Sequence, residues 1–244
     1  MTDPAQWRRR QLETARELLD DEQVALQHGN LQAAVDFVDE ALVILEMAQA
    51  EGQDDAVRRL QARALNDRGL LYQQTDQPEQ ARPLHRRAAE VTEAVEDFDD
   101  DFKASAAAIY LNLGQIALFD EDYERARDIT ERAVELVADL REREVEGTAS
   151  LALSVYQNKT AVESFDGNFA EAETVARDAV DLAEELTAAG NPSALGQAAR
   201  ICQQLSVQMF ESGEQEGALE WGRRAEELSE RAYDHVGEPA LHLY

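Results

Sequence analysis

Two columns of alanine recur five times along the chain and constrain its fold more than any other feature. Members of the first column are separated by 47, 45, 46 and 46 residues, and each is followed seven residues later by a member of the second. The columns are Ala34, Ala81, Ala126, Ala172 and Ala218, then Ala41, Ala88, Ala133, Ala179 and Ala225. Small side chains two turns apart on one helix face let neighbouring helices approach closely, so the columns predict stacked helical repeats.

Apolar residues at three- and four-residue spacings, interrupted by Gly, Asn, Asp and Pro, divide each repeat into two helices joined by a short turn. The predicted hairpins cover residues 4–51, 54–97, 101–143, 147–189 and 192–235, with a non-helical tail at 236–244. Asp3 and Pro4 predict the first helix start. The stretch from Glu142 to Ser154 has few stop signals, and its helix boundary is open on sequence alone. We expect an all-α fold, a right-handed superhelix (α-solenoid) of about five antiparallel hairpins.

The third hairpin resembles the tetratricopeptide repeat through Tyr110, Leu113, Gly114, Ala126 and Ala133, which stand at that family's intervals. The second hairpin shows the same pattern at Leu65, Gly69, Tyr72, Ala81 and Ala88. Ala117 stands where the family usually has tyrosine, and His85 and Thr130 stand where it usually has phenylalanine. The period near 46 exceeds the family's usual ~34, which resembles the long-helix repeats of kinesin light chain. A HEAT-like array, with a period of ~40–47, is the alternative.

The resemblance implies a concave face formed by the first helix of each hairpin. It therefore implies a non-enzymatic protein–protein interaction module or scaffold that binds an extended peptide or a partner helix in its concave groove. The alternative is a regulatory or sensory module that binds a small effector or self-associates.

An amide column gives the first candidate site residues on this face. It consists of Asn66, Asn112, Asn158 and Gln204, each 46 residues apart. Amides donate and accept hydrogen bonds, which suits pairing with the backbone of an extended peptide. On this interpretation, replacing Asn112 and Asn158 with alanine abolishes partner binding and leaves thermal stability nearly unchanged. The alternative is that the amides solvate a helix face or bridge neighbouring repeats.

Charged and aromatic residues complete the candidate partner-binding set. Arg63, Lys159 and Arg200 bring positive charge to hold an acidic peptide, with structural salt bridges as the alternative. A near-periodic set of phenylalanines lies beside the amide column: Phe119, Phe165 and Phe210. Aromatic residues at this spacing are typical of core packing between repeats, and less often of ligand pockets.

Composition restricts the partner class. The chain has 51 Asp and Glu against 23 Lys and Arg, a net charge of −28, and only two lysines. Carboxylates spread over every segment are typical of halophilic surfaces, and without a basic stripe we expect no nucleic-acid partner. The four histidines have no metal-ligand spacing and no catalytic motif is found, so we expect no metal, no cofactor and no enzymatic activity.

Cys202 is the lone cysteine, so we expect a buried thiol, no disulfide and a cytoplasmic location. The N-terminus lacks an apolar signal core and no apolar run reaches ~18 residues, so we expect no membrane span. Trp7 and the Arg8 to Arg10 run predict a capping extension of the array, or alternatively a basic docking patch. The tail from Val236 to Tyr244 is apolar, and its docking on a neighbouring copy would give a homodimer.

Overall fold

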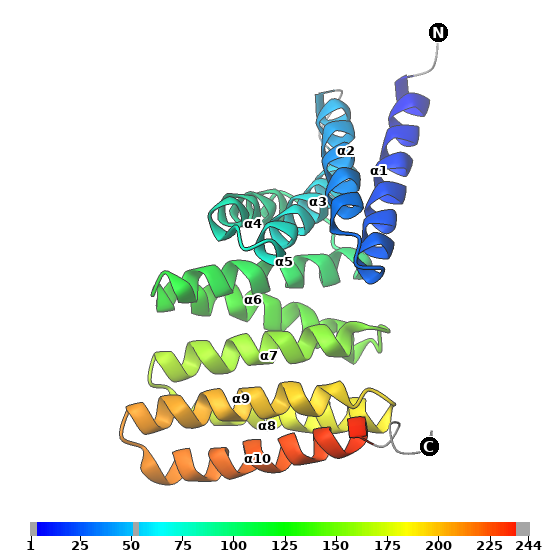
Figure 1. The fold of residues 1–244 in the computed structure, drawn as a ribbon. Helices are drawn as coiled ribbons and strands as arrows, with labels where there is room; N and C mark the ends of the chain where they lie inside the picture. Colours follow the sequence, from blue (N-terminus) through cyan, green and yellow to red (C-terminus); the bar gives the residue numbers. More distant parts are fainter. Residues whose placement is uncertain (1–3, 51–53, 238–244) are drawn as a thin grey trace, which may run out of the picture. The chain divides into compact units, whose positions relative to one another are not determined.

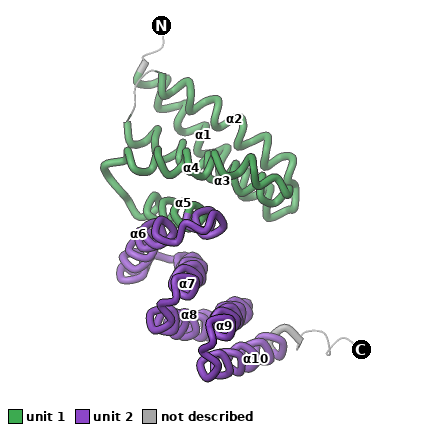
Figure 2. The backbone as a smooth tube through the Cα atoms, turned by 90° about the vertical axis from the view of Figure 1, so that its left-hand side faces the viewer, with its two compact units in different colours: residues 1–113 green, residues 114–244 purple. Residues whose placement is uncertain are grey.

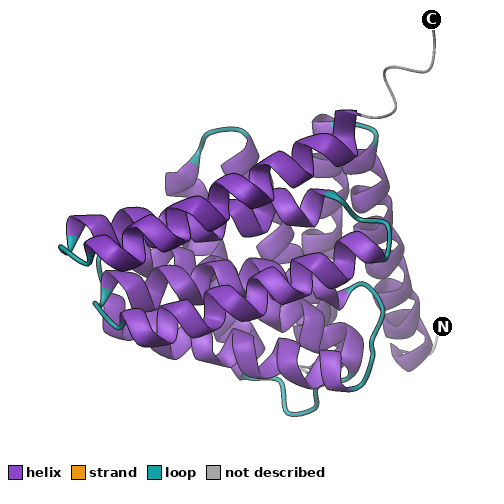
Figure 3. Cartoon of the chain, turned by 90° about the horizontal axis from the view of Figure 1, so that it is seen from below, coloured by secondary structure: helices purple, strands orange, loops and turns teal. Residues whose placement is uncertain are grey.

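The computed structural model describes residues 4–50 and 54–237 (Figure 1). This part of the chain consists of α-helices joined by loops, as Figure 3 shows. The helices are α1 (Pro4–Gln27), α2 (Leu31–Ala50), α3 (Asp55–Gln74), α4 (Pro78–Glu93), α5 (Asp100–Phe119), α6 (Tyr123–Glu142), α7 (Thr148–Phe165), α8 (Phe169–Ala188), α9 (Ser193–Glu211) and α10 (Gln215–Gly237). These ten described helices are arranged as antiparallel pairs in a tetratricopeptide-like solenoid, which confirms the expected fold class.

The chain divides into two compact units, Met1–Leu113 and Gly114–Tyr244 (Figure 2). The boundary falls inside α5, so this helix contributes its first part to unit 1 and its last turns to unit 2. In unit 1, α1 pairs with α2 and α3 with α4. In unit 2, α7 pairs with α8 and α9 with α10, and the first helices α7 and α9 contact each other directly.

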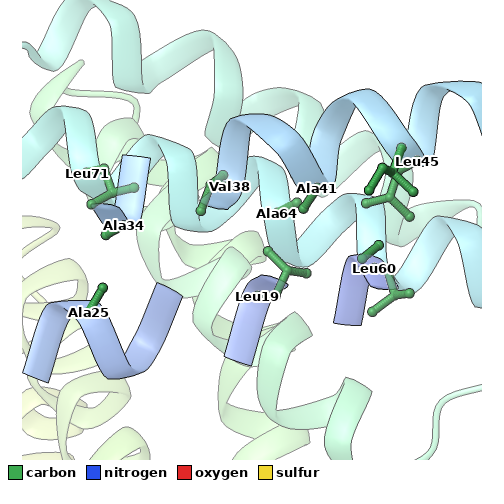
Figure 4. Packing of buried hydrophobic residues seen from close by; sticks show 11 residues of the cluster. Leu19, Ala25, Ala34, Val38, Ala41, Leu45, Leu60, Ala64 and Leu71 are labelled. Atoms are coloured by element: carbon green, nitrogen blue, oxygen red, sulfur yellow. The ribbon is translucent and has the colours of Figure 1, made fainter. Parts of the chain in front are cut away.

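The two alanine columns are packing positions in both units. Every member of both columns is at least 92% buried, and seven of the ten have no exposed surface. Figure 4 shows Ala34 and Ala41 of α2 in the core of unit 1, within the cluster that also contains Leu19 and Leu60. A larger side chain at these positions would push the packed helices apart. Alanine recurs there because the repeat requires neighbouring helices to approach closely.

Short carboxylate side chains begin several helices. The Asp54 carboxylate accepts a hydrogen bond from the Val57 N–H at 3.0 Å, and Asp99 accepts one from the Phe102 N–H at 2.9 Å. Each bond satisfies a backbone donor that has no partner inside its own helix. The predicted cap Asp3 lies outside the described residues.

The second hairpin ends earlier than predicted, because α4 stops at Glu93 and not near residue 97. The helix continues through Pro83. After it, the Asp55 carboxylate accepts hydrogen bonds from the N–H groups of Glu96 and Asp97, at 3.0 and 3.1 Å. These contacts fix an extended connection to α5 where the sequence predicted further helix.

The uncertain boundary between Glu142 and Ser154 is a helix break. α6 ends at Glu142 and α7 begins at Thr148, and the loop between them places Glu144 and Gly147 at positive φ. At the other end of unit 2, α10 extends to Gly237, so residues 236 and 237 are helical where a tail was predicted. The remaining tail, residues 238–244, lies outside the described residues.

By length and composition, α5 is the one helix among residues 4–50 and 54–237 that is apolar enough to cross a membrane. Its most apolar window is 56% buried inside the protein. Ile109 and Leu113 are among its buried side chains, so the apolar character of this helix belongs to core packing.

Candidate interaction site

Three members of the amide column are buried between helices. Asn66, Asn112 and Asn158 are only 5%, 7% and 4% exposed. In unit 1, the Asn112 Nδ2 donates to Asn66 Oδ1 at 2.8 Å, which links α5 to α3. The same oxygen lies 3.0 Å from His85 Nδ1, so it accepts from two neighbouring helices. These amides hold the hairpins of unit 1 together.

The amide of Asn158 has the corresponding role in unit 2. Its Nδ2 donates to Thr130 Oγ1 at 2.9 Å, across the contact between α7 and α6. Gly114 of α5 makes room for this pair, because a Cβ built there would lie 2.7 Å from Asn158 Nδ2. The prediction that the three asparagines present their amides to a peptide is therefore wrong, and the bridging alternative is correct. Gln204, which is partly exposed, is the one member of the column at the surface.

Lys159 is also used inside the protein. It is 7% exposed, and its Nζ lies 2.9 Å from Glu163 Oε1 and contacts the Glu131 carboxylate as well. Burial acts to raise the pKa of Glu163, but hydrogen bonds from Lys159, Asn168 and Arg127 outweigh it and hold that pKa below its ordinary value. For Lys159 the structural salt bridge is therefore the correct interpretation.

Arg63 connects α3 to α1 and still faces solvent. Its Nη2 donates to the Leu19 carbonyl at 2.9 Å and to Asp20 Oδ1 at 3.1 Å. Arg200, the third predicted cation, is exposed on α9 in unit 2.

A groove of about 440 Å³ crosses the first helices of three successive hairpins in unit 1 and opens to solvent. We name it the first-helix groove. Residues from α1, α3 and the start of α5 line it, including Arg16, Gln23, Arg59, Arg63, Phe102 and Ser105. A second cavity of about 440 Å³ adjoins it along α1 and α3 and shares Arg16, Ala56 and Leu60 with it.

Charges cancel in the first-helix groove, in contrast to the chain as a whole. Its lining contains three arginines and three aspartates: Arg16, Arg59, Arg63, Asp20, Asp99 and Asp101. The net charge of the chain is −28. In this groove a carboxylate of a partner therefore meets less repulsion than the net charge of the chain would produce.

Within the groove, the planar guanidinium of Arg59 makes two ion pairs and lies near an aromatic ring. The Arg59 guanidinium pairs with Asp97 and Asp99 and lies 5.9 Å from the centroid of the Phe102 ring. Asp97 is 84% and Asp20 62% exposed at the side chain, so the arginines are held by carboxylates that solvent already reaches. Exposed pairs of this kind contribute about 0–1 kcal/mol, and a partner's carboxylate can replace one of them at little cost.

At the start of α1, Arg8 lies 3.0 Å from Asp54 at the start of α3. This contact fits the predicted capping extension, while Arg9 lines the second cavity and faces solvent.

Comparison with known proteins identifies the repeat. The family model described as "Tetratricopeptide repeat" matches residues 60–139. This part of the chain is therefore similar to the tetratricopeptide repeat. No curated protein matches the chain.

Solved structures extend the likeness in fold to almost the whole chain. BtubC from P. vanneervenii superposes with a TM-score of 0.62 and 16% identity, covering 100% of this chain and 95% of its own. A putative kinesin light chain from Podospora anserina with nearly identical repeats gives 0.56 and 15%, covering 98% and 100%. The S. pombe nuclear import adaptor Nro1 gives 0.51 and 10%, covering 94% and 95%. Identities this low show the fold, and they agree with the expected kinesin-light-chain-like repeats in place of the HEAT-like alternative.

The departures from the tetratricopeptide pattern explain where the amides point. His85 has no exposed surface, packs against Gly69 and bonds to Asn66, while Thr130 is equally buried and bonds to Asn158. Burial lowers the pKa of His85 to about 4, so the ring is neutral near pH 7. His85 and Thr130 are polar where the family usually has phenylalanine. This substitution was the sequence signal that each packs against a buried polar side chain, the amide of an asparagine.

The three phenylalanines are neither core nor groove residues. Phe119, Phe165 and Phe210 are 77%, 44% and 67% exposed. They lie at or next to the last residue of α5, α7 and α9, where the chain leaves the packed helices. The interpretation as core packing is therefore wrong, and none of the three lines the first-helix groove of unit 1.

The groove is also lined by three residues that were not predicted from the sequence, Arg16, Arg59 and Phe102, which lie beside Arg63. A signal was present, because Arg16 and Asp20 on the first helix precede Arg59 and Arg63 on the next first helix by 43 residues each.

Two further features of the sequence, the single cysteine and the possibility of a metal site, can be compared with the structure. Cys202 is buried, as predicted, and burial raises the pKa of its thiol to about 11. Within residues 4–50 and 54–237, no group of three His, Cys, Asp or Glu side chains is placed to hold a metal ion.

Proposed function

We propose that this tetratricopeptide repeat protein is a non-enzymatic interaction module whose first-helix groove binds an extended peptide or a helix of a protein partner. The observation that carries the proposal is the solvent-open groove across α1, α3 and α5, where three hairpins supply one continuous lining. Repeat proteins of this kind use such extended surfaces to bind other proteins.

The lining determines which partner segment fits. Arg16 is exposed and makes no ion pair among the described residues, so it is open to a partner's carboxylate. Ala56 and Leu60 supply apolar surface beside it. A segment with an acidic residue next to an aliphatic one matches both features, and the neutral lining spares it the repulsion of the surrounding acidic surface.

Two wider expectations accompany this proposal. A single buried cysteine and no disulfide suit the cytoplasm. A net charge of −28 suits an environment of high salt, where screening relieves repulsion between carboxylates.

Selection from a random peptide library, with the wild-type protein in molar salt, tests the groove. Ser105→Trp places a large ring in the groove, since Ser105 lines it on α5. Val43→Trp is the matched control, because Val43 is 56% exposed on the second helix α2 and does not line the groove.

We expect selected peptides to bind wild type with a Kd on the order of 1–100 μM and Ser105→Trp at least about tenfold more weakly. Val43→Trp should bind like wild type. Equal affinity for wild type and Ser105→Trp would show that the groove is not the binding surface.

A further inference from the structure

Exposed phenylalanines mark one side of unit 2. The turns that follow α5, α7 and α9 lie together on the left in Figure 1, at the same ends of parallel first helices (Figures 1 and 3). An exposed phenylalanine precedes each turn, and we name the row formed by Phe119, Phe165 and Phe210 the turn edge. Scattered exposed apolar residues are ordinary, but a row of large rings indicates an interaction surface.

The packing of the first helices sets the spacing of the rings. Gly114 of α5 lies against Asn158 of α7, and Gln197 Nε2 of α9 donates to Ser154 Oγ of α7 at 3.0 Å. Helices in such contact have axes about 8–10 Å apart, so successive rings are separated by roughly that distance. Residues i and i+7 on one face of an α-helix are about 10.5 Å apart along its axis, which is close to the separation of successive rings.

The middle ring of the row, Phe165, is held in place. Phe165 stacks on Tyr123 of α6, with the ring centroids 6.0 Å apart and the planes at 12°. Tyr123 is the first residue of α6, so the stack braces the middle of the turn edge against the neighbouring hairpin. A ring fixed in this way loses little conformational entropy when a partner covers it.

Carboxylates surround the rings. The turns contain exposed Asp120, Glu121, Asp122, Asp166, Glu211 and Glu214. The cations beside them are Arg125 and Arg127, and Arg127 is engaged with Glu163 and Asp166. An apolar row with this border attracts a cationic partner and repels an acidic one.

We propose that the turn edge of unit 2 is a second docking surface, which binds a basic amphipathic helix of another protein with aliphatic side chains at i, i+7 and i+14. The aliphatic side chains cover the three rings, and flanking lysines or arginines meet the turn carboxylates. This surface is separate from the first-helix groove, and its occupant has the opposite charge.

The probe is a synthetic amphipathic peptide with leucine at i, i+7 and i+14 and lysine on its flanks, compared with a scrambled peptide of the same composition. Binding is measured by fluorescence anisotropy with wild type, Phe119→Ser/Phe210→Ser and Leu219→Ser. Leu219 is the matched control, because it is 64% exposed on α10 and is not part of the row. The circular dichroism of each variant shows whether it is folded.

We expect Phe119→Ser/Phe210→Ser to bind the peptide at least about tenfold more weakly than wild type. Leu219→Ser and the groove variant Ser105→Trp should bind it like wild type. Equal affinity for Phe119→Ser/Phe210→Ser, or for the scrambled peptide, would overturn the proposal. A wild-type dimer in sedimentation that Phe119→Ser/Phe210→Ser abolishes would also overturn it, because a second copy would then occupy the row.

Discussion

Two helical glycines are matched to buried polar side chains of neighbouring helices. A Cβ built at Gly69 would lie 2.6 Å from His85 Cε1, and one built at Gly114 would lie 2.7 Å from Asn158 Nδ2 and 2.8 Å from Thr130 Oγ1. Both glycines stand where the tetratricopeptide pattern has glycine. A larger residue does not fit there, because side chains of neighbouring helices already occupy the space that a Cβ would take.

We predict that Gly114→Ala lowers the free energy of unfolding by about 2 kcal/mol, because the new methyl group displaces a buried hydrogen-bonded pair. Gly196→Ala is the control: no atom lies within 4 Å of its Cβ position in α9. Alanine there should raise stability by about 0.5–1 kcal/mol through helix propensity. Denaturant unfolding in molar salt measures both. Equal stability of Gly114→Ala and wild type would contradict the packing described.

The asparagines give a second prediction at this scale. Asn158→Ala leaves Thr130 Oγ1 without its buried partner, and Asn112→Ala removes a donor to Asn66. Each change should lower the free energy of unfolding by about 1–3 kcal/mol. The partly exposed Gln204→Ala should change it by no more than about 0.5 kcal/mol. Thermal midpoints that match wild type would restore the expectation that these amides serve a partner.

The sequence shows which residue types recur, but not where their side chains point. The alanine columns were correctly interpreted because a small residue on a repeating helix face has one main use, close packing. The asparagine column has two uses, since ligand-facing and helix-bridging positions share the same period. His85 and Thr130 decide between them, and only the structure shows that they contact the amides.

Among the elements, the contact of α1 with α3 contains an unusual pair of carboxylates. Glu22 of α1 is 2% exposed. Burial raises its pKa to about 7, with the charge of Asp67 acting in the same direction and Arg63 opposing both. Burial also raises the pKa of Asp67 to about 6, against the opposing effect of Arg63. Each of the two carboxyl groups therefore keeps its proton to a higher pH in the folded protein than its ordinary pKa would allow.

This arrangement predicts a pH dependence. Because the folded pKa of Glu22 exceeds the ordinary 4.5, the folded protein loses stability as pH rises from about 4.5 through about 7. Glu22→Gln removes the ionisation and should stabilise the protein by about 1–3 kcal/mol at about pH 8, with little effect at about pH 5. The control is Glu13→Gln, which is exposed on the same helix. Denaturant unfolding at both pH values checks this, and the same change at each would contradict it.

Helices and hairpin turns were predictable because their signals are local. The break between α6 and α7 was harder to predict from the sequence. One of its two residues at positive φ is Glu144, and glutamate is not a residue type that indicates a turn. The early end of α4 depends on Asp55, about forty residues away, whose carboxylate holds the following loop. Such long-range contacts cannot be found from helix periodicity.

Across the whole molecule, the two units carry different surfaces. Unit 1 contains the first-helix groove with balanced charge, and unit 2 contains the turn edge with exposed rings and carboxylates. The family resemblance predicted the repeat fold, but the groove is assembled from side chains of three hairpins. Arg63 was predicted as a groove residue, while Arg16, Arg59 and Phe102 required the helices to be placed side by side.

Photo-crosslinking of a library-selected peptide tests the groove most directly. A photoreactive benzoylphenylalanine replaces Ser105 in the groove, or Val43 on the exposed face of α2, and mass spectrometry identifies the crosslinked residues. We expect a crosslink from position 105 that excess unlabelled peptide suppresses, and none from position 43. A crosslink from position 43 with none from position 105 would contradict it.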